Sequence, residues 1–279
     1  MRFVHVAILV IIVPLTACRL SISEREVFQP NPYNRRDLDG PLVLDNENRL
    51  PPWVTLHHAR QASAIGPIAT TLAETPSDRL IVHCGGNASD RKTGGVFYLA
   101  GLLEFGDVLL FDYPGYGDSA GTATAGEVEA ALDEIAEIAR AREPDELVLW
   151  GQSLGGFVCA SLATRLLDQV QLMVFETTAR NAEAVAESWT PWFMKPFMSF
   201  EVSDGLDAWD NVHAMEGFSG RILVLGAAKD RVLPVELSRD LARDLEAAGH
   251  DVRYVEFDQA THMTVPRQPG YREAVGSAL

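Results

Sequence analysis

The chain has 279 residues, of which 47% are hydrophobic and 22% charged, so it can bury the core of one large domain. Its formal net charge of −16 at pH 7 argues against nucleic-acid binding, because the phosphates would be repelled by such a surface.

A hydrophobic segment opens the chain. Arg2 precedes a nearly continuous hydrocarbon run over residues 4–15, whose length suits the core of a secretory signal peptide better than a membrane span. The run ends at Leu15-Thr16-Ala17-Cys18, which resembles the lipobox of bacterial lipoproteins, where the cysteine becomes the lipidated first residue. We therefore expect a signal peptide over residues 1–17 and a lipid anchor of palmitate-like chains on Cys18. An ordinary signal peptide or an N-terminal anchor helix remains the alternative.

This resemblance also implies a location. A lipidated Cys18 would hold the protein in the bacterial cell envelope, attached to a membrane. Arg19 follows the cysteine, where an aspartate would tend to retain a lipoprotein at the inner membrane. The periplasmic side of the outer membrane is therefore slightly favoured.

Beyond the cysteine, the composition changes twice. Residues 18–50 include a stretch rich in Pro, Asn and Arg and are expected to form a lipidated tether that drapes over the following domain. Residues 53–59 and 65–72 favour an antiparallel pair of strands at a sheet edge. Buried strands are then predicted at 80–84, 108–112, 147–150, 172–175, 222–225 and 252–257, and helices at about 93–104, 124–142, 154–167 and 235–248.

The alternation of continuous apolar strands with amphipathic helices predicts an α/β domain over residues 51–279. Its sheet should have about eight mostly parallel strands, with helices on both faces. Ligands in such sheets bind at the carboxyl ends of the strands.

The pentapeptide Gly151-Gln152-Ser153-Leu154-Gly155 lies between a predicted strand and a predicted helix. In that context G-x-S-x-G is typical of a nucleophile elbow, a turn too tight for side chains two places either side of the serine. The alternative is an ordinary glycine-rich turn.

Two further motifs accompany the elbow. Asp112-Tyr113-Pro114-Gly115-Tyr116-Gly117-Asp118-Ser119 is similar to the D-x-x-G-x-G-x-S turn of α/β-hydrolases, and Gly85-Gly86-Asn87-Ala88 resembles the His-Gly-Asn-Ala loop of small membrane-associated serine hydrolases. In this chain Gly85 stands where that loop has its histidine.

From about residue 50 to its end, the chain therefore resembles an α/β-hydrolase. The resemblance implies a serine hydrolase that cleaves carboxylic esters or thioesters of a small or lipid-like acyl substrate through a Ser-His-Asp triad and an acyl-enzyme. A peptidase or amidase of the same fold, or a non-catalytic binding lipoprotein, are the alternatives.

The nucleophile needs a base and an acid. In the superfamily order both follow Ser153, and His262 lies in the loop after the last predicted strand, at the catalytic end of the sheet. Asp230 lies in residues 226–234, a stretch that resembles the superfamily's acid loop, and Glu176 is its rival. An oxyanion hole should be formed by the backbone N–H of Leu154 and, by resemblance, that of Asn87 or alternatively Gly86. The side chain of Asn87 could instead cap the following turn.

Two features remain open. The long segment at about 177–219 is expected to form a cap over the acyl pocket, and its aromatic part at 189–200 could contact a membrane, an acyl chain or the sheet. Cys84 and Cys159 are predicted to be buried free thiols, with a disulfide between them as the less favoured alternative. We expect no cofactor or metal, because no dinucleotide, phosphate-loop or metal-binding motif is present.

Overall fold

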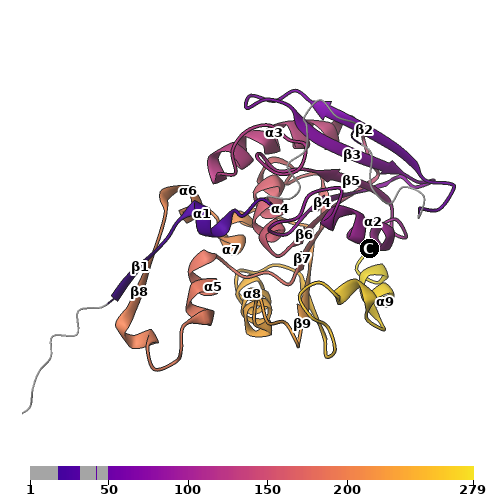
Figure 1. Cartoon of the computed structure of the whole chain (residues 1–279). Helices are drawn as coiled ribbons and strands as arrows, with labels where there is room; N and C mark the ends of the chain where they lie inside the picture. The colour runs from indigo at the N-terminus through magenta and orange to yellow at the C-terminus, as the bar shows by residue number, and fades with distance from the viewer. Residues whose placement is uncertain (1–17, 32–41, 43–49) are drawn as a thin grey trace, which may run out of the picture.

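The computed structural model describes residues 18–31, 42 and 50–279. At its centre lies a sheet in the order β10-β9-β7-β6-β4-β5-β3-β2 (Figure 1). Its strands are β2 (Thr55–Gln61), β3 (Ile68–Glu74), β4 (Arg79–Cys84), β5 (Asp107–Phe111), β6 (Glu146–Gln152), β7 (Val170–Glu176), β9 (Arg221–Ala227) and β10 (Val252–Phe257). The β2–β3 and β3–β5 pairs are antiparallel and the other pairs are parallel, so the predicted mostly parallel sheet with an antiparallel edge is confirmed.

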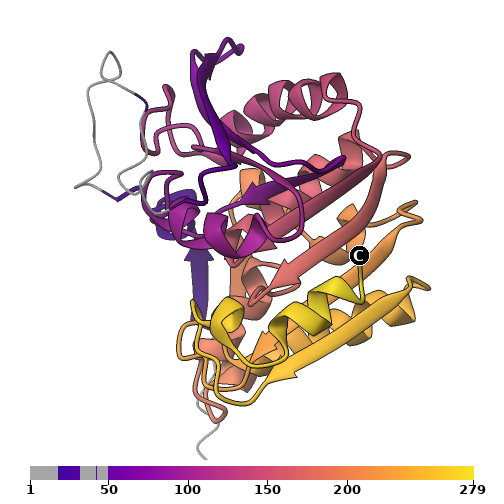
Figure 2. The ribbon, with the colours of Figure 1, turned by 90° about the vertical axis from the view of Figure 1, so that its right-hand side faces the viewer.

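Helices cover both faces of this sheet (Figure 2). On one face lie α3 (Ala125–Ala141), α4 (Leu154–Arg165) and α8 (Val235–Ala247), and on the other α2 (Gly94–Leu102) and α9 (Tyr271–Gly276). Within β6, Leu147 and Leu149 pack into the first core, whereas Val148 and Trp150 pack into the second. Burial on both faces explains why this strand has a continuous apolar sequence rather than an alternating one.

The segment between β7 and β9 contains α5 (Ala182–Trp189), the 3₁₀ turn η3 (Lys195–Phe197), β8 (Met198–Val202), α6 (Asp204–Asp207) and α7 (Asn211–Ala214). The chain after Cys18, where the sequence suggested a tether, forms β1 (Cys18–Ile22) and α1 (Glu24–Val27), and β1 pairs in parallel with β8. This two-stranded ribbon lies beside α5, apart from the main sheet (Figure 1).

The predicted signal peptide at 1–17 and most of residues 32–49 lie outside the described residues. Across the part of the chain that the structure does describe, no helix is both long enough and apolar enough to cross a bilayer.

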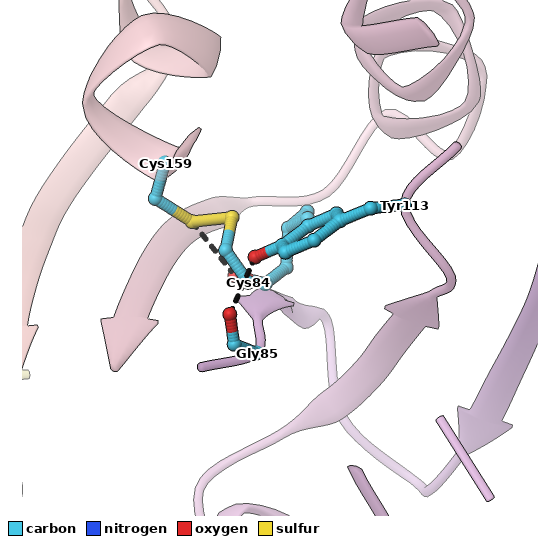
Figure 3. The surroundings of a disulfide bond; sticks show 5 residues. Cys84, Gly85, Tyr113 and Cys159 are labelled. Atoms are coloured by element: carbon cyan, nitrogen blue, oxygen red, sulfur yellow. Dashed lines mark hydrogen bonds between the residues drawn. A yellow bond between two sulfur atoms is a disulfide. The ribbon is translucent and has the colours of Figure 1, made fainter. Parts of the chain in front are cut away.

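Cys84 and Cys159 form a disulfide, so the prediction of two free thiols was wrong (Figure 3). Both residues are fully buried, as expected. Cys84 ends β4, and Cys159 lies on the side of α4 that packs against the sheet, which brings the two Cα atoms to 5.8 Å, within the usual range for a bridge. Sequence patterns identified the burial of each cysteine but not this approach between elements that are distant in the chain.

Candidate active site

Ser153 lies in a strained turn between β6 and α4, as the pentapeptide predicted. Its φ of 53° and ψ of −119° fall in a region that a residue with a side chain rarely adopts. Its backbone N–H donates to the carbonyl of Glu176 at 2.9 Å, and its carbonyl accepts the hydroxyl of Thr178 at 2.8 Å. These contacts to the end of β7 hold the turn in place and offset its strain.

The two outer glycines of the pentapeptide are needed because backbone segments meet closely here. A Cβ on Gly151 would overlap the carbonyl of Gly155, and a Cβ on Gly155 would overlap the carbonyl of Cys84. The absence of side chains at these two positions lets α4 begin directly against the end of β4.

Asp230 and His262 form a hydrogen-bonded pair at the carboxyl ends of β9 and β10. The Oδ2 atom of Asp230 lies 2.7 Å from Nδ1 of His262, and the two side chains are 1% and 13% exposed. The other carboxylate oxygen accepts the backbone N–H groups of Val232 and Leu233 at 2.8 and 2.9 Å. The carboxylate is therefore fixed by its own loop and can orient the imidazole.

The second imidazole nitrogen of His262 makes no hydrogen bond to Ser153. It lies 3.3 Å from the side-chain nitrogen of Gln152, the residue before the serine. Among the described residues, the Ser153 hydroxyl makes no hydrogen bond. The structure thus forms the hydrogen bond between Asp230 and His262 but none between His262 and Ser153. Sequence reasoning missed Gln152, whose only signal was its place inside the pentapeptide.

Backbone donors surround the serine. Leu154 is the first residue of α4, so its N–H has no acceptor within the helix. The N–H groups of Gly86 and Asn87, in the loop after β4, also have no acceptor in the part of the chain that the structure describes. Asn87, Ser153 and Leu154 line the same cavity, and a Cβ on Gly86 would come within 3.4 Å of that of Ser153. Both loop positions therefore remain candidates for the second donor.

The side chain of Asn87 contacts the N-terminal segment. Its Oδ1 accepts the backbone N–H of Gln29 at 2.9 Å and that of Ala88 at 3.0 Å, together with the hydroxyl of Tyr116 at 2.9 Å. Its Nδ2 donates to the carbonyl of Val27 at 2.7 Å. The side chain thus caps the turn through Ala88, and it also fastens residues 27–29 to the loop after β4.

Hydrogen bonds from the Asp112–Ser119 turn hold the loop after β4 in place. The hydroxyl of Tyr113 donates to the carbonyl of Gly85 at 2.6 Å, next to the disulfide (Figure 3). Farther along, buried Arg91 donates through Nη2 to Asp118 at 2.6 Å, and its backbone N–H donates to Asp112 at 2.7 Å. The Asp112–Ser119 turn therefore supports the loop after β4. Sequence reasoning did not predict these hydrogen bonds of Tyr113 and Arg91.

Glu176, the rival acid, is fully buried at the end of β7. Its two oxygens accept the hydroxyl of Tyr98 at 3.0 Å and the indole N–H of Trp150 at 2.9 Å. Burial raises the pKa of this carboxyl to about 7. His83 stacks on Tyr98, and burial lowers its pKa to about 3. Because Glu176 makes no hydrogen bond to His262, the geometry favours Asp230 as the orienting carboxylate.

A cavity of about 520 Å³ opens beside Ser153. Its walls are α5, the β1–β8 ribbon and the loop that follows Asp230, and its lining is mostly hydrocarbon and aromatic: Leu20, Ile22, Val27, Leu154, Phe157, Val185, Trp189, Met194, Met198, Phe200, Val232 and Leu233. In the described ranges, no group of three or more His, Cys, Asp or Glu side chains is placed to hold a metal ion.

Solved structures share this architecture. A hydrolase from Vibrio vulnificus superposes with a TM-score of 0.66 at 16% identity, covering 80% of this chain and 81% of its own. An esterase from Pyrococcus furiosus gives a TM-score of 0.64 at 17% identity, covering 86% and 98%. A family profile described as alpha/beta hydrolase fold matches residues 80–202. The chain has the α/β-hydrolase fold. The predicted fold class is confirmed.

The chain also resembles two known proteins at low identity. The lysophosphatidylserine lipase ABHD12 of Danio rerio is 29% identical over 205 residues, which cover 66% of this chain and 53% of the lipase. An uncharacterized protein of Mycobacterium tuberculosis is 27% identical over 187 residues, covering 65% and 62%. The chain thus spans about half the length of the lipases that it matches.

Proposed function

We propose that the chain belongs to the α/β-hydrolase superfamily and is a serine hydrolase of carboxylic esters or thioesters, with Ser153 as nucleophile, His262 as base and Asp230 as the orienting acid. One observation carries the proposal. A serine held at a φ of 53° opens onto an apolar cavity, at the sheet edge where an imidazole and a buried carboxylate lie 2.7 Å apart. Packing of a hydrophobic core does not require this combination of groups.

The proposed reaction begins with attack by the Ser153 hydroxyl on the acyl carbon. His262 takes the serine proton through Nε2, which requires the Gln152 amide to withdraw from that nitrogen. Asp230 keeps the proton of Nδ1 in place and stabilises the imidazolium that forms. The backbone N–H groups of Leu154 and of Asn87 or Gly86 then receive the oxyanion, each contributing about 3 kcal/mol. His262 returns the proton to the leaving alcohol or thiol, and a water molecule hydrolyses the acyl-enzyme.

Two observations support esters of lipid-like acids. The cavity beside Ser153 has few polar side chains, which suits a hydrocarbon chain better than a peptide. The relatives named above as lysophosphatidylserine lipases act, by that name, on a lipid ester.

We also propose that the protein is lipid-anchored through Cys18 in the bacterial cell envelope. The Cys84–Cys159 disulfide supports an oxidising compartment such as the periplasm. Near the cavity, Trp189 and Trp192 are 63% and 82% exposed. Phe193 and Phe197 are exposed as well, and such a cluster of aromatic side chains suits a surface that lies close to lipid.

A fluorophosphonate probe tests the catalytic proposal. The wild-type protein should be labelled and should hydrolyse p-nitrophenyl butyrate, whereas Ser153→Ala should do neither. Thermal unfolding of both proteins, followed by circular dichroism, shows that the variant is folded. Folded wild-type protein that is not labelled and cleaves no ester would contradict the proposal and favour a binding protein.

A further inference from the structure

The β1–β8 ribbon has one apolar face and one polar face. Leu20 pairs with Phe200 and Ile22 with Val202, and residues in register on parallel strands share a face. The next positions along the two strands, on the opposite face, are Arg19, Ser21, Ser199 and Glu201. There Arg19 Nε lies 3.0 Å from Glu201 Oε2, and both side chains are largely exposed.

The apolar face closes the cavity that contains the candidate nucleophile. Leu20, Ile22 and Phe200 line the cavity on the ribbon side. Val185 and Trp189 of α5 line it as well, and so does Ser153. An occupant must therefore place a reacting group at the serine and hydrocarbon against the ribbon, which describes an ester with a long acyl chain.

The N-terminal strand is held firmly enough to act as a wall. After it, Phe28 is buried and packs edge-on against Trp209, with ring centroids 5.4 Å apart. The Asn87 side chain bonds to both Val27 and Gln29, so the segment is fixed to the loop that also carries the candidate oxyanion donors. The side chain of Asn87 thus connects the N-terminal segment, which lines the cavity, with the loop that carries the candidate oxyanion donors.

We propose that β1 forms one wall of a binding site for the long acyl chain of the substrate and determines how long a chain the enzyme prefers. This inference rests on the proposed esterase activity. Leu20 is 44% exposed and Trp189 63% exposed, so an acyl chain in the cavity would bury apolar surface from both walls. The N-terminal segment is therefore part of the substrate site.

The test compares chain-length preference in the full-length protein. The variant Leu20→Ser with Ile22→Ser changes the apolar face, and the matched control Arg19→Ser with Glu201→Ser makes the same replacement on the polar face. For each, kcat/KM is measured with p-nitrophenyl butyrate and p-nitrophenyl dodecanoate below their aggregation limits. The readout is the ratio of dodecanoate to butyrate.

Burial of each methylene is worth about fourfold in binding, so the loss of two apolar wall side chains should lower this ratio at least tenfold. Most of the change should appear in KM for dodecanoate. The control should keep the wild-type ratio within twofold, because an exposed ion pair on the far face contributes little.

A ratio is insensitive to partial unfolding, which lowers both rates alike. Leu20→Trp provides a second variant that enlarges the wall side chain instead of shortening it. It should take up part of the cavity and shift the preference toward shorter esters.

The outcomes separate the two proposals. Equal ratios in the apolar-face variant, the control and the wild type would overturn this inference while leaving the esterase in place. A wild-type protein that cleaves butyrate and rejects dodecanoate would also overturn it. Failure of the wild type to cleave either ester would refute the proposed function itself.

Discussion

The disulfide allows the strongest quantitative prediction. Replacing both Cys84 and Cys159 with alanine removes a bridge that closes a loop of 75 residues. In the chain-entropy description, cross-linking a loop of that length stabilises the folded state by about 4.5 kcal/mol at 25 °C. For a domain of this size each kcal/mol moves Tm by about 2–4 °C, so the variant should melt about 9–18 °C lower.

The bridge should also matter for catalysis. Cys84 immediately precedes the Gly85–Asn87 loop, and Cys159 lies in the second turn of the helix that Leu154 begins. The disulfide thus ties together the two candidate sources of oxyanion donors. Loss of the disulfide should lower kcat more than it raises KM. The largest expected decrease in kcat is that from losing one oxyanion donor, about 3 kcal/mol or roughly 150-fold.

Melting curves measured by circular dichroism and ester hydrolysis rates test both parts. The single variants Cys84→Ala and Cys159→Ala serve as controls, since each also removes the bridge and should melt about as low as the double variant. The bonding itself is read from the mass of the wild-type protein after alkylation without reductant. Alkylation of Cys84 and Cys159 in the wild type, or a double variant that melts within about 3 °C of it, would refute the reasoning.

Three further predictions concern single side chains. Asp230→Asn should lower kcat by about 10³–10⁴-fold, because the imidazole loses the partner that fixes its tautomer, whereas Glu176→Gln should retain most activity; the reverse order would assign the acid to Glu176. Burial raises the pKa of Glu176 from 4.5 to about 7, so the folded state holds this proton more tightly than the unfolded state. The free energy of unfolding should therefore fall by about 3 kcal/mol as pH rises from 4.5 to 7. Denaturant unfolding at several pH values should show this slope in the wild type and not in Glu176→Gln. Cys18→Ala should abolish incorporation of labelled palmitate in bacterial cells, and equal labelling of variant and wild type would exclude the anchor.

Much of the fold was readable because its signals are local. The strand predicted at 252–257 and the helix predicted at 235–248 match β10 and α8 to within a residue. Continuous apolar runs become strands when both faces of a sheet are covered, and glycines mark turns that no side chain would fit. The candidate acid and base were readable for the same reason, since each follows a recognisable strand at the edge where parallel strands end.

The β1–β8 ribbon could not be predicted from the sequence in this way. β1 alternates Arg19, Leu20, Ser21 and Ile22, which is a strand pattern, but its partner begins 180 residues later at Met198. Five residues without a neighbour carry no fold signal, because such a strand is stabilised only by the partner it pairs with.

The sequence alone therefore determined the sheet, the tight turn at Ser153 and the candidate residues around it, because each of these depends on neighbours within a few positions. Only the tertiary structure decided which distant groups meet: Cys84 with Cys159, Gln152 with His262, and the N-terminal strand with the wall of the cavity. Such contacts arise from the packing of whole elements against one another. No local pattern encodes their distances.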